Sequence, residues 1–160
     1  MEDKELLKQL RDYLSRSEFF SELSEQEIEE ASEYFEIKSF MPGDVIYREG
    51  DKASEMAIVL FGTLKAVITK DPKPYSVELK DGTIIGEVGL LGNVPRTADV
   101  VCATPAVVAA ISRESYERMK KENPVLALKF IEAAARILAK RFENVDASLK
   151  KTLLWFTRSH

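Results

Sequence analysis

The glycines of this chain are confined to its middle. All seven lie between residues 43 and 92, and the segments on either side contain none. Glycine adopts left-handed backbone conformations without steric cost, so its positions mark tight turns between strands. Hydrophobic residues recur at helical spacing on both sides of this region. The sequence therefore predicts N-terminal helices over 1–34, a β-rich body over 35–111 and C-terminal helices over 112–160.

Within the middle region, short apolar and β-branched runs alternate with turn signals such as Pro42-Gly43-Asp44 and Asp81-Gly82. This alternation is typical of an antiparallel sandwich or barrel. We expect a mostly β fold with flanking helices, specifically an antiparallel jelly-roll or β-roll of about eight strands. The candidate strands are 35–40, 45–47, 56–60, 63–69, 75–79, 97–103 and 106–111.

The N-terminal segment predicts two helices. Ser24 and Glu27 form a capping box with Leu23 and Ile28 as its hydrophobic staple, so one helix should run over 25–34. The other helix is predicted by apolar residues at helical spacing, namely Leu6, Leu7, Leu10, Tyr13 and Leu14.

The C-terminal segment predicts a short helix capped by Ser112 and a long one that starts at Asn123-Pro124 and reaches residue 157. One interpretation is a helix packed flat on its own domain. The other is self-association, which the sequence favours because an apolar seam with flanking charges continues too far for one domain face. A homodimer through helix 124–157 is expected, with the seam Ile131, Ala135, Leu138, Phe142, Val145, Leu149, Thr152 and Phe156.

Composition excludes several functional classes. The net charge of −4 provides no basic surface for duplex nucleic acid at whole-chain level. The only histidine is His160, so we expect no metal site, no cofactor and no histidine-dependent catalysis, and a jelly-roll enzyme is disfavoured. Cys102 is expected to be a small buried hydrophobe. Without a signal peptide or a membrane span, the chain is expected to be cytoplasmic.

The segment 85–100, IGEVGLLGNVPRTADV, contains the candidate ligand-binding residues. Gly86 and Gly89 permit a close backbone approach to a ligand, and residues 87–91 suffice for about one helical turn with free N–H groups. Nine residues after Glu87 comes Arg96, whose planar guanidinium suits a phosphate. Glu87 is an acceptor for a sugar hydroxyl.

This segment resembles the phosphate-binding cassette of the cyclic-nucleotide-binding domains, the family of the catabolite activator protein and of the regulatory subunits of cAMP-dependent protein kinase. The cassette pattern is G-E-[LV]-[AG]-L followed by P-R-[AST]-A, and the resemblance extends over nearly the whole chain. It implies that Glu87 binds the ribose 2′-hydroxyl and Arg96 the exocyclic phosphate oxygens of cAMP or cGMP. Further implied ligand residues are Gly86, the amides of Val88 and Ala98 or Thr97, the base- or ribose-flanking Ile85, Leu79 and Val88, and the base-capping Arg141 and Phe142.

The sequence departs from the catabolite activator protein in one respect and leaves two questions open. The chain ends at TLLWFTRSH without room for a helix-turn-helix, so no direct DNA binding is expected. Thr97 follows Arg96, as in many cGMP-binding relatives, but some cAMP binders share this hydroxyl, so base choice stays open. The alternative to a nucleotide sensor is a degenerate scaffold or interaction module that binds no nucleotide. The expected partners are a cyclic nucleotide, a second copy of the chain and an unidentified protein that receives the signal.

Overall fold

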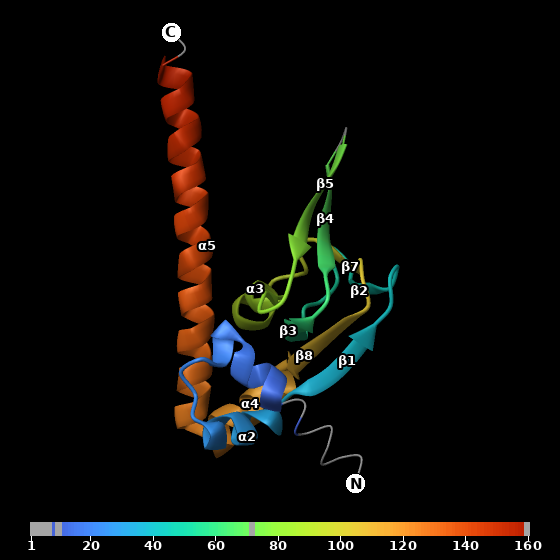
Figure 1. The fold of residues 1–160 in the computed structure, drawn as a ribbon, viewed down its shortest axis with the longest axis vertical. Helices are drawn as coiled ribbons and strands as arrows, with labels where there is room; N and C mark the ends of the chain where they lie inside the picture. The colour runs from blue at the N-terminus through green and yellow to red at the C-terminus, as the bar shows by residue number, and fades with distance from the viewer. Residues whose placement is uncertain (1–7, 9–10, 71–72, 159–160) are drawn as a thin grey trace.

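The computed structural model, which describes residues 8, 11–70 and 73–158, contains two antiparallel four-stranded sheets. One sheet has the order β1 (Glu36–Phe40), β8 (Ala106–Ser112), β3 (Glu55–Phe61) and β6 (Ile84–Ile85). The other has the order β2 (Val45–Tyr47), β7 (Asp99–Cys102), β4 (Leu64–Lys70) and β5 (Lys73–Leu79). The sheets face each other as a roll with helices at its base and side (Figure 1). The predicted mostly β fold with flanking helices is confirmed.

Strand β6 was not among the candidate strands. It has only two residues, Ile84 and Ile85, which pair with Ile58 and Ala57 of β3. A run this short shows no period of two, so the sequence pattern could not separate it from the turn that precedes it. The pairing matters because β6 leads directly into the segment 86–96.

The N-terminal segment folds into helical turns around residues 11–16, the 3₁₀ turn η1 (Glu18–Phe20) and helix α2 (Glu25–Ser32). The Ser24–Glu27 capping box is present, with each side chain accepting from the other residue's backbone N–H. Helix α2 ends at Ser32, two residues before the predicted end. The predicted apolar positions Leu6, Leu7 and Leu10 lie outside the described residues.

Helices α4 (Arg113–Glu122) and α5 (Pro124–Arg158) follow the roll. The predicted caps are present: Ser112 Oγ accepts from the Ser115 amide, and Asn123 Oδ1 accepts from the Leu126 amide. Pro124 is the first residue of α5, where its missing N–H costs no helical hydrogen bond. Helix α5 rises from the base of the molecule and continues past the roll (Figure 1).

Two hydrophobic cores hold these elements in place. One lies between the sheets and includes Val59, Leu64 and Val108. The other joins the helices to the β1–β8–β3–β6 sheet and includes Phe20, Met56, Ile111, Leu126 and Phe130. Four phenylalanine rings meet edge-on or tilted within it, namely Phe19, Phe20, Phe35 and Phe130. The N-terminal helices and the first half of α5 are thereby fixed to the roll.

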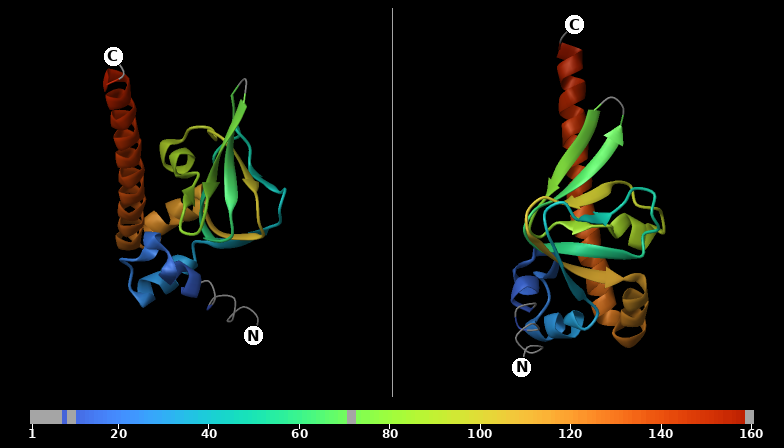
Figure 2. Two further views of the ribbon diagram at one scale, coloured as in Figure 1. Left: turned by 45° about the horizontal axis from the view of Figure 1, so that its top comes forward. Right: turned by 90° about the vertical axis from the view of Figure 1, so that its right-hand side faces the viewer.

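Helix α5 changes character halfway along its length. Its first half is packed on the chain's own domain through Leu126, Phe130 and Ala134, all at most 3% exposed. The apolar side chains of its second half are exposed as far as Leu154: Phe142, Val145 and Leu149 are 74%, 65% and 56% exposed. The left view of Figure 2 shows this half of α5 rising beside the roll. The prediction of a helix packed flat on its own domain therefore holds for the first half only. The predicted dimer seam is exposed to solvent from Phe142 to Leu149. The side chain of Phe156 lies outside the described residues.

Candidate functional site

The segment after β6 begins with a left-handed glycine. Gly86 has φ +81° and precedes α3 (Glu87–Gly92), the predicted helical turn. A β-carbon at this position would be strained and would collide with Nη1 of Arg96. Gly86 therefore brings the start of α3 directly against the Arg96 guanidinium. The first amides of a helix have no intrahelical partner, so those at the start of α3 are available to an acceptor.

Arg96 is a buried arginine with an unsatisfied nitrogen. Its side chain is 8% exposed, and its Nη1 has no hydrogen-bond partner within the described part of the chain. The backbone is fixed, because the Arg96 amide donates to the Asp51 carbonyl and the Gly50 amide donates to the Arg96 carbonyl, both at 2.9 Å. A buried cationic donor without a partner is costly, and an anionic oxygen would satisfy it.

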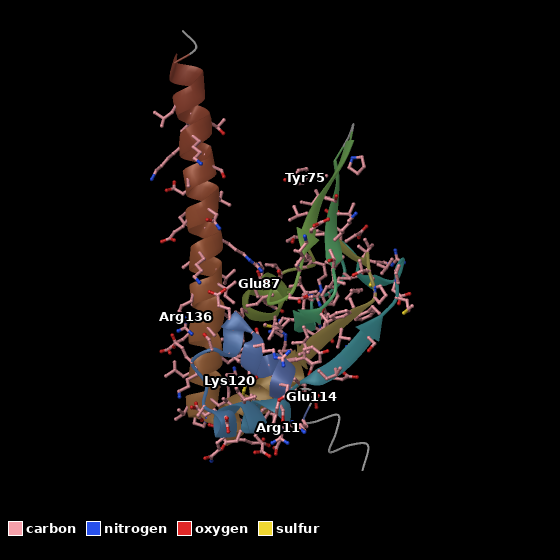
Figure 3. The ribbon with its side chains drawn as sticks, in the orientation of Figure 1. Arg11, Tyr75, Glu87, Glu114, Lys120 and Arg136 are labelled. Carbon is pink, nitrogen blue, oxygen red and sulfur yellow. The ribbon has the colours of Figure 1, made fainter. Side chains whose placement is uncertain are left out.

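Glu87 lies on the side of the roll that faces α5 (Figure 3). It is 5% exposed, although it carries a carboxylate. Arg141 of α5 reaches it: Nη1 of Arg141 contacts the Glu87 carboxylate and Nη2 contacts the Ile84 carbonyl. The carboxylate expected to accept from a ribose is thus paired with the helix residue expected to cap the base.

These groups line one cavity of about 440 Å³, within the range of about 300–1,000 Å³ usual for small-ligand sites. It gathers nearly all the residues expected from the sequence: Leu79, Ile85, Gly86, Glu87, Val88, Arg96, Thr97, Ala98 and Arg141. Phe142 lies outside this lining and is 74% exposed. Contact between any of these residues and a nucleotide stays a prediction. Tyr47 also lines the cavity, and nothing in its strand pattern distinguished it from an ordinary β residue.

A larger cavity of about 720 Å³ lies between the N-terminal turns, β3 and α5. It shares Thr83 and Arg141 with the smaller one. Three cations line it: Arg16, Lys140 and Arg141. Lys140 pairs with Glu18 and Arg141 with Glu87. The smaller cavity combines the buried Arg96, the Gly86 turn and the Glu87 carboxylate, so it is the candidate functional site.

The described residues contain no group of three histidine, cysteine, aspartate or glutamate side chains placed to hold a metal ion. Cys102 is buried and donates to the Thr104 carbonyl at 2.8 Å, and burial raises the pKa of its thiol. In the described ranges, no helix combines the length and the apolar character needed to cross a bilayer.

Comparison with known proteins gives consistent matches. A sequence model of the family described as "Cyclic nucleotide-binding domain" matches residues 37–123, more than half of the 160-residue chain. The chain is 32% identical over 124 residues to a cGMP-dependent protein kinase of Eimeria tenella, covering 72% of this chain and 12% of the kinase. It is 28% identical over 107 residues to a cAMP-dependent protein kinase regulatory subunit of Pyricularia oryzae, covering 67% of this chain and 27% of the subunit.

Comparison with solved structures gives a match to a protein with the same fold. The catabolite activator protein of Thermus thermophilus superposes with a TM-score of 0.73 at 25% identity, covering 84% of this chain and 62% of that chain. The chain spans less than a third of the length of either kinase relative, where the matched domain is one part of a larger protein. The family is typically regulatory. The family match, the β-roll and the arginine-lined cavity lead to one conclusion: this chain belongs to the cyclic nucleotide-binding domain family.

Proposed function

We propose that this chain is a regulatory sensor that binds cAMP or cGMP, without catalysis, in the 440 Å³ cavity. One observation carries the proposal: Arg96 lines this cavity, and its buried Nη1 has no hydrogen-bond partner among the residues that the structure describes. A cyclic phosphate has exocyclic oxygens that match a guanidinium in charge and hydrogen bonding. The amides of Val88 and of Ala98 or Thr97 add donors to the same phosphate, and Leu79, Ile85 and Val88 provide apolar contacts to ribose or base.

Isothermal titration of the whole chain with cAMP and with cGMP tests this function. We expect saturable binding with one site per chain, and much weaker binding of the matching 5′-monophosphates, which carry an additional negative charge and no 3′,5′ ring. If millimolar cAMP or cGMP gives no measurable heat of binding, the sensor function is contradicted. The chain would then be a scaffold that keeps the fold without binding nucleotide.

The output of the sensor is proposed to pass through α5. Arg141 pairs with Glu87, the group proposed for the ribose 2′-hydroxyl, so nucleotide and helix meet at the same carboxylate. A ligand shifts a helix only by its difference in affinity between the two helix positions. The ribose hydroxyl and Arg141 both use the Glu87 carboxylate, so the affinity for nucleotide differs between the helix position with the Arg141–Glu87 pair and the position without it. A homodimer through the exposed seam of α5, or an unidentified protein partner on it, would receive the change.

Replacing Arg141 by alanine should uncouple binding from helix movement. The variant should bind nucleotide within about tenfold of the parent (roughly 1.4 kcal/mol), because Arg96 and the cassette amides are untouched and Glu87 is freed for the ribose. Hydrogen exchange measures the coupling. The parent should gain protection over residues 136–156 on saturation with nucleotide, and the variant should not.

The matched control is Arg136→Ala. Arg136 is an arginine of the same helix, but it pairs with Glu22 at 3.1 Å and lines neither the cavity nor the cassette. Its replacement should leave both affinity and ligand-induced protection as in the parent. Identical exchange of the parent helix with and without saturating nucleotide would refute the switch while leaving the binding proposal standing.

Thr97 is expected to affect base choice. It is exposed at the rim of the cavity, where its hydroxyl could accept from a guanine amino group. Thr97→Ala should weaken cGMP more than cAMP, by at most about tenfold, since one neutral hydrogen bond is worth roughly 0.5–1.5 kcal/mol. Thr97→Ser keeps the hydroxyl and should restore the parent ratio. Equal losses for both nucleotides would restrict Thr97 to the phosphate.

A second function is favoured by one observation. The exposed apolar side chains on the second half of α5, such as Phe142 and Val145, suit a docking surface whether or not nucleotide binds. An interaction module of this kind would associate through α5 and give no heat of binding in the nucleotide titrations.

A further inference from the structure

Tyr47 lies directly against the guanidinium of Arg96. Cζ of Arg96 is 3.5 Å from the centroid of the Tyr47 ring, and both side chains are 8% exposed. The two residues come from different elements: Tyr47 ends β2, and Arg96 lies in the loop between α3 and β7. A guanidinium over an aromatic face is attracted by the electron-rich ring, more strongly where water is excluded. One face of the Arg96 guanidinium is therefore covered by this ring.

The ring is itself held in place. Its hydroxyl donates to Oε1 of Glu55 at 3.0 Å, and Nζ of Lys38 donates to Oε2 of the same carboxylate at 2.7 Å. Burial raises the pKa of Tyr47, and the charge of Glu55 raises it further, so the hydroxyl stays protonated and keeps donating at neutral pH. A chain of contacts thus runs from Lys38 through Glu55 and Tyr47 to Arg96.

The remaining freedom of Arg96 is small. Its backbone is tied to Gly50 and Asp51 by two hydrogen bonds, three and four residues after Tyr47. Its Nη1 lies against Gly86, at a position that a β-carbon would occupy. With one face on the ring and one edge against the glycine, the guanidinium has one plane available to it.

We propose that Tyr47 is a positioning residue that fixes the plane of the Arg96 guanidinium, and so fixes which exocyclic phosphate oxygen Arg96 binds. The inference rests on the proposed nucleotide function and deepens it. A guanidinium held in one plane presents its donors in one direction, and the two exocyclic oxygens of a cyclic phosphate are not equivalent in a chiral pocket. Tyr47 acts through Arg96 and supplies stereochemical selectivity as well as affinity.

The test uses cAMP and its two diastereomeric phosphorothioates, in which sulfur replaces one exocyclic oxygen or the other. Sulfur is a poor acceptor, so the parent should prefer the diastereomer that keeps oxygen at Arg96. Tyr47→Leu removes the ring face and should weaken cAMP about 3- to 30-fold, the range of a cation–π contact. It should also shrink the preference between diastereomers. Tyr47→Phe keeps the face and should retain both affinity, within about threefold, and preference.

The outcomes separate the alternatives. If Tyr47→Leu keeps the parent's preference, whether or not its affinity falls, the ring has only a structural role and the inference is overturned. A parent that binds cAMP without distinguishing the diastereomers overturns it as well. A parent that binds no nucleotide overturns the proposed function itself. If Tyr47→Leu does not fold, Tyr47→Met takes its place, because an unbranched side chain fills the site without a ring face. It should show the same loss of preference, and an unchanged preference there refutes the inference.

Discussion

Replacing Arg96 by alanine should all but abolish nucleotide binding. Arg96 is buried, its Nη1 has no partner among the described residues, and it lines the cavity together with the start of α3. Removing one partner of a buried charge pair costs roughly 2–5 kcal/mol, which corresponds to a loss of about 30-fold to several thousand-fold in affinity. Isothermal titration with cAMP and cGMP measures the loss.

Three further variants separate charge, geometry and general damage. Arg96→Lys keeps the charge without the planar fork and should bind at an intermediate level. Glu87→Ala should cost less than Arg96→Ala, because a ribose hydroxyl can be solvated again by water. Arg48→Ala replaces an exposed arginine of the same region that does not line the cavity, and should bind as the parent does. Parent-like binding by a folded Arg96→Ala chain would show that the site has been assigned to the wrong cavity.

Placing a glutamate at Val145 should convert the expected dimer into monomers. Val145 is 65% exposed in the single chain and lies in the seam between Phe142 and Leu149. In a helix pair its side chain would be buried against its twin, and two unpaired carboxylates would meet there. By analogy with unpaired charges buried at other interfaces, the free energy of dimerisation should become less favourable by roughly 2–5 kcal/mol. Sedimentation analysis at micromolar concentration measures the change of mass.

The matched control uses the same side chain on the opposite side of the same helix. Ala147 is exposed and lies two residues beyond Val145, which places it away from the seam. Ala147→Glu should therefore remain dimeric. A parent chain that is already monomeric at this concentration would refute dimerisation through α5, and an equal effect of both glutamates would place the interface elsewhere on the helix.

The local structure of this chain followed from its sequence. The Ser24–Glu27 capping box and the Asn123-Pro124 helix start were predicted from residue types alone and are present in the structure. Caps and turns depend on residues a few positions apart, so their chemistry is visible in sequence order. The helical turn after Gly86 was predicted for the same reason, because the glycine and the turn lie within one short segment. Strand β6 was missed because two residues carry no period.

Contacts between distant segments were decided by the tertiary structure. Tyr47 meets Arg96, and Arg141 meets Glu87, only because β2, α3 and α5 come together around one cavity. The same holds for α5: its apolar pattern continues without a break, yet its first half is buried on the roll and its second half is exposed as far as Leu154. Sequence periodicity shows which face of a helix is apolar, but not which element packs against that face. What covers each half depends on where the roll ends, and that boundary exists only in three dimensions.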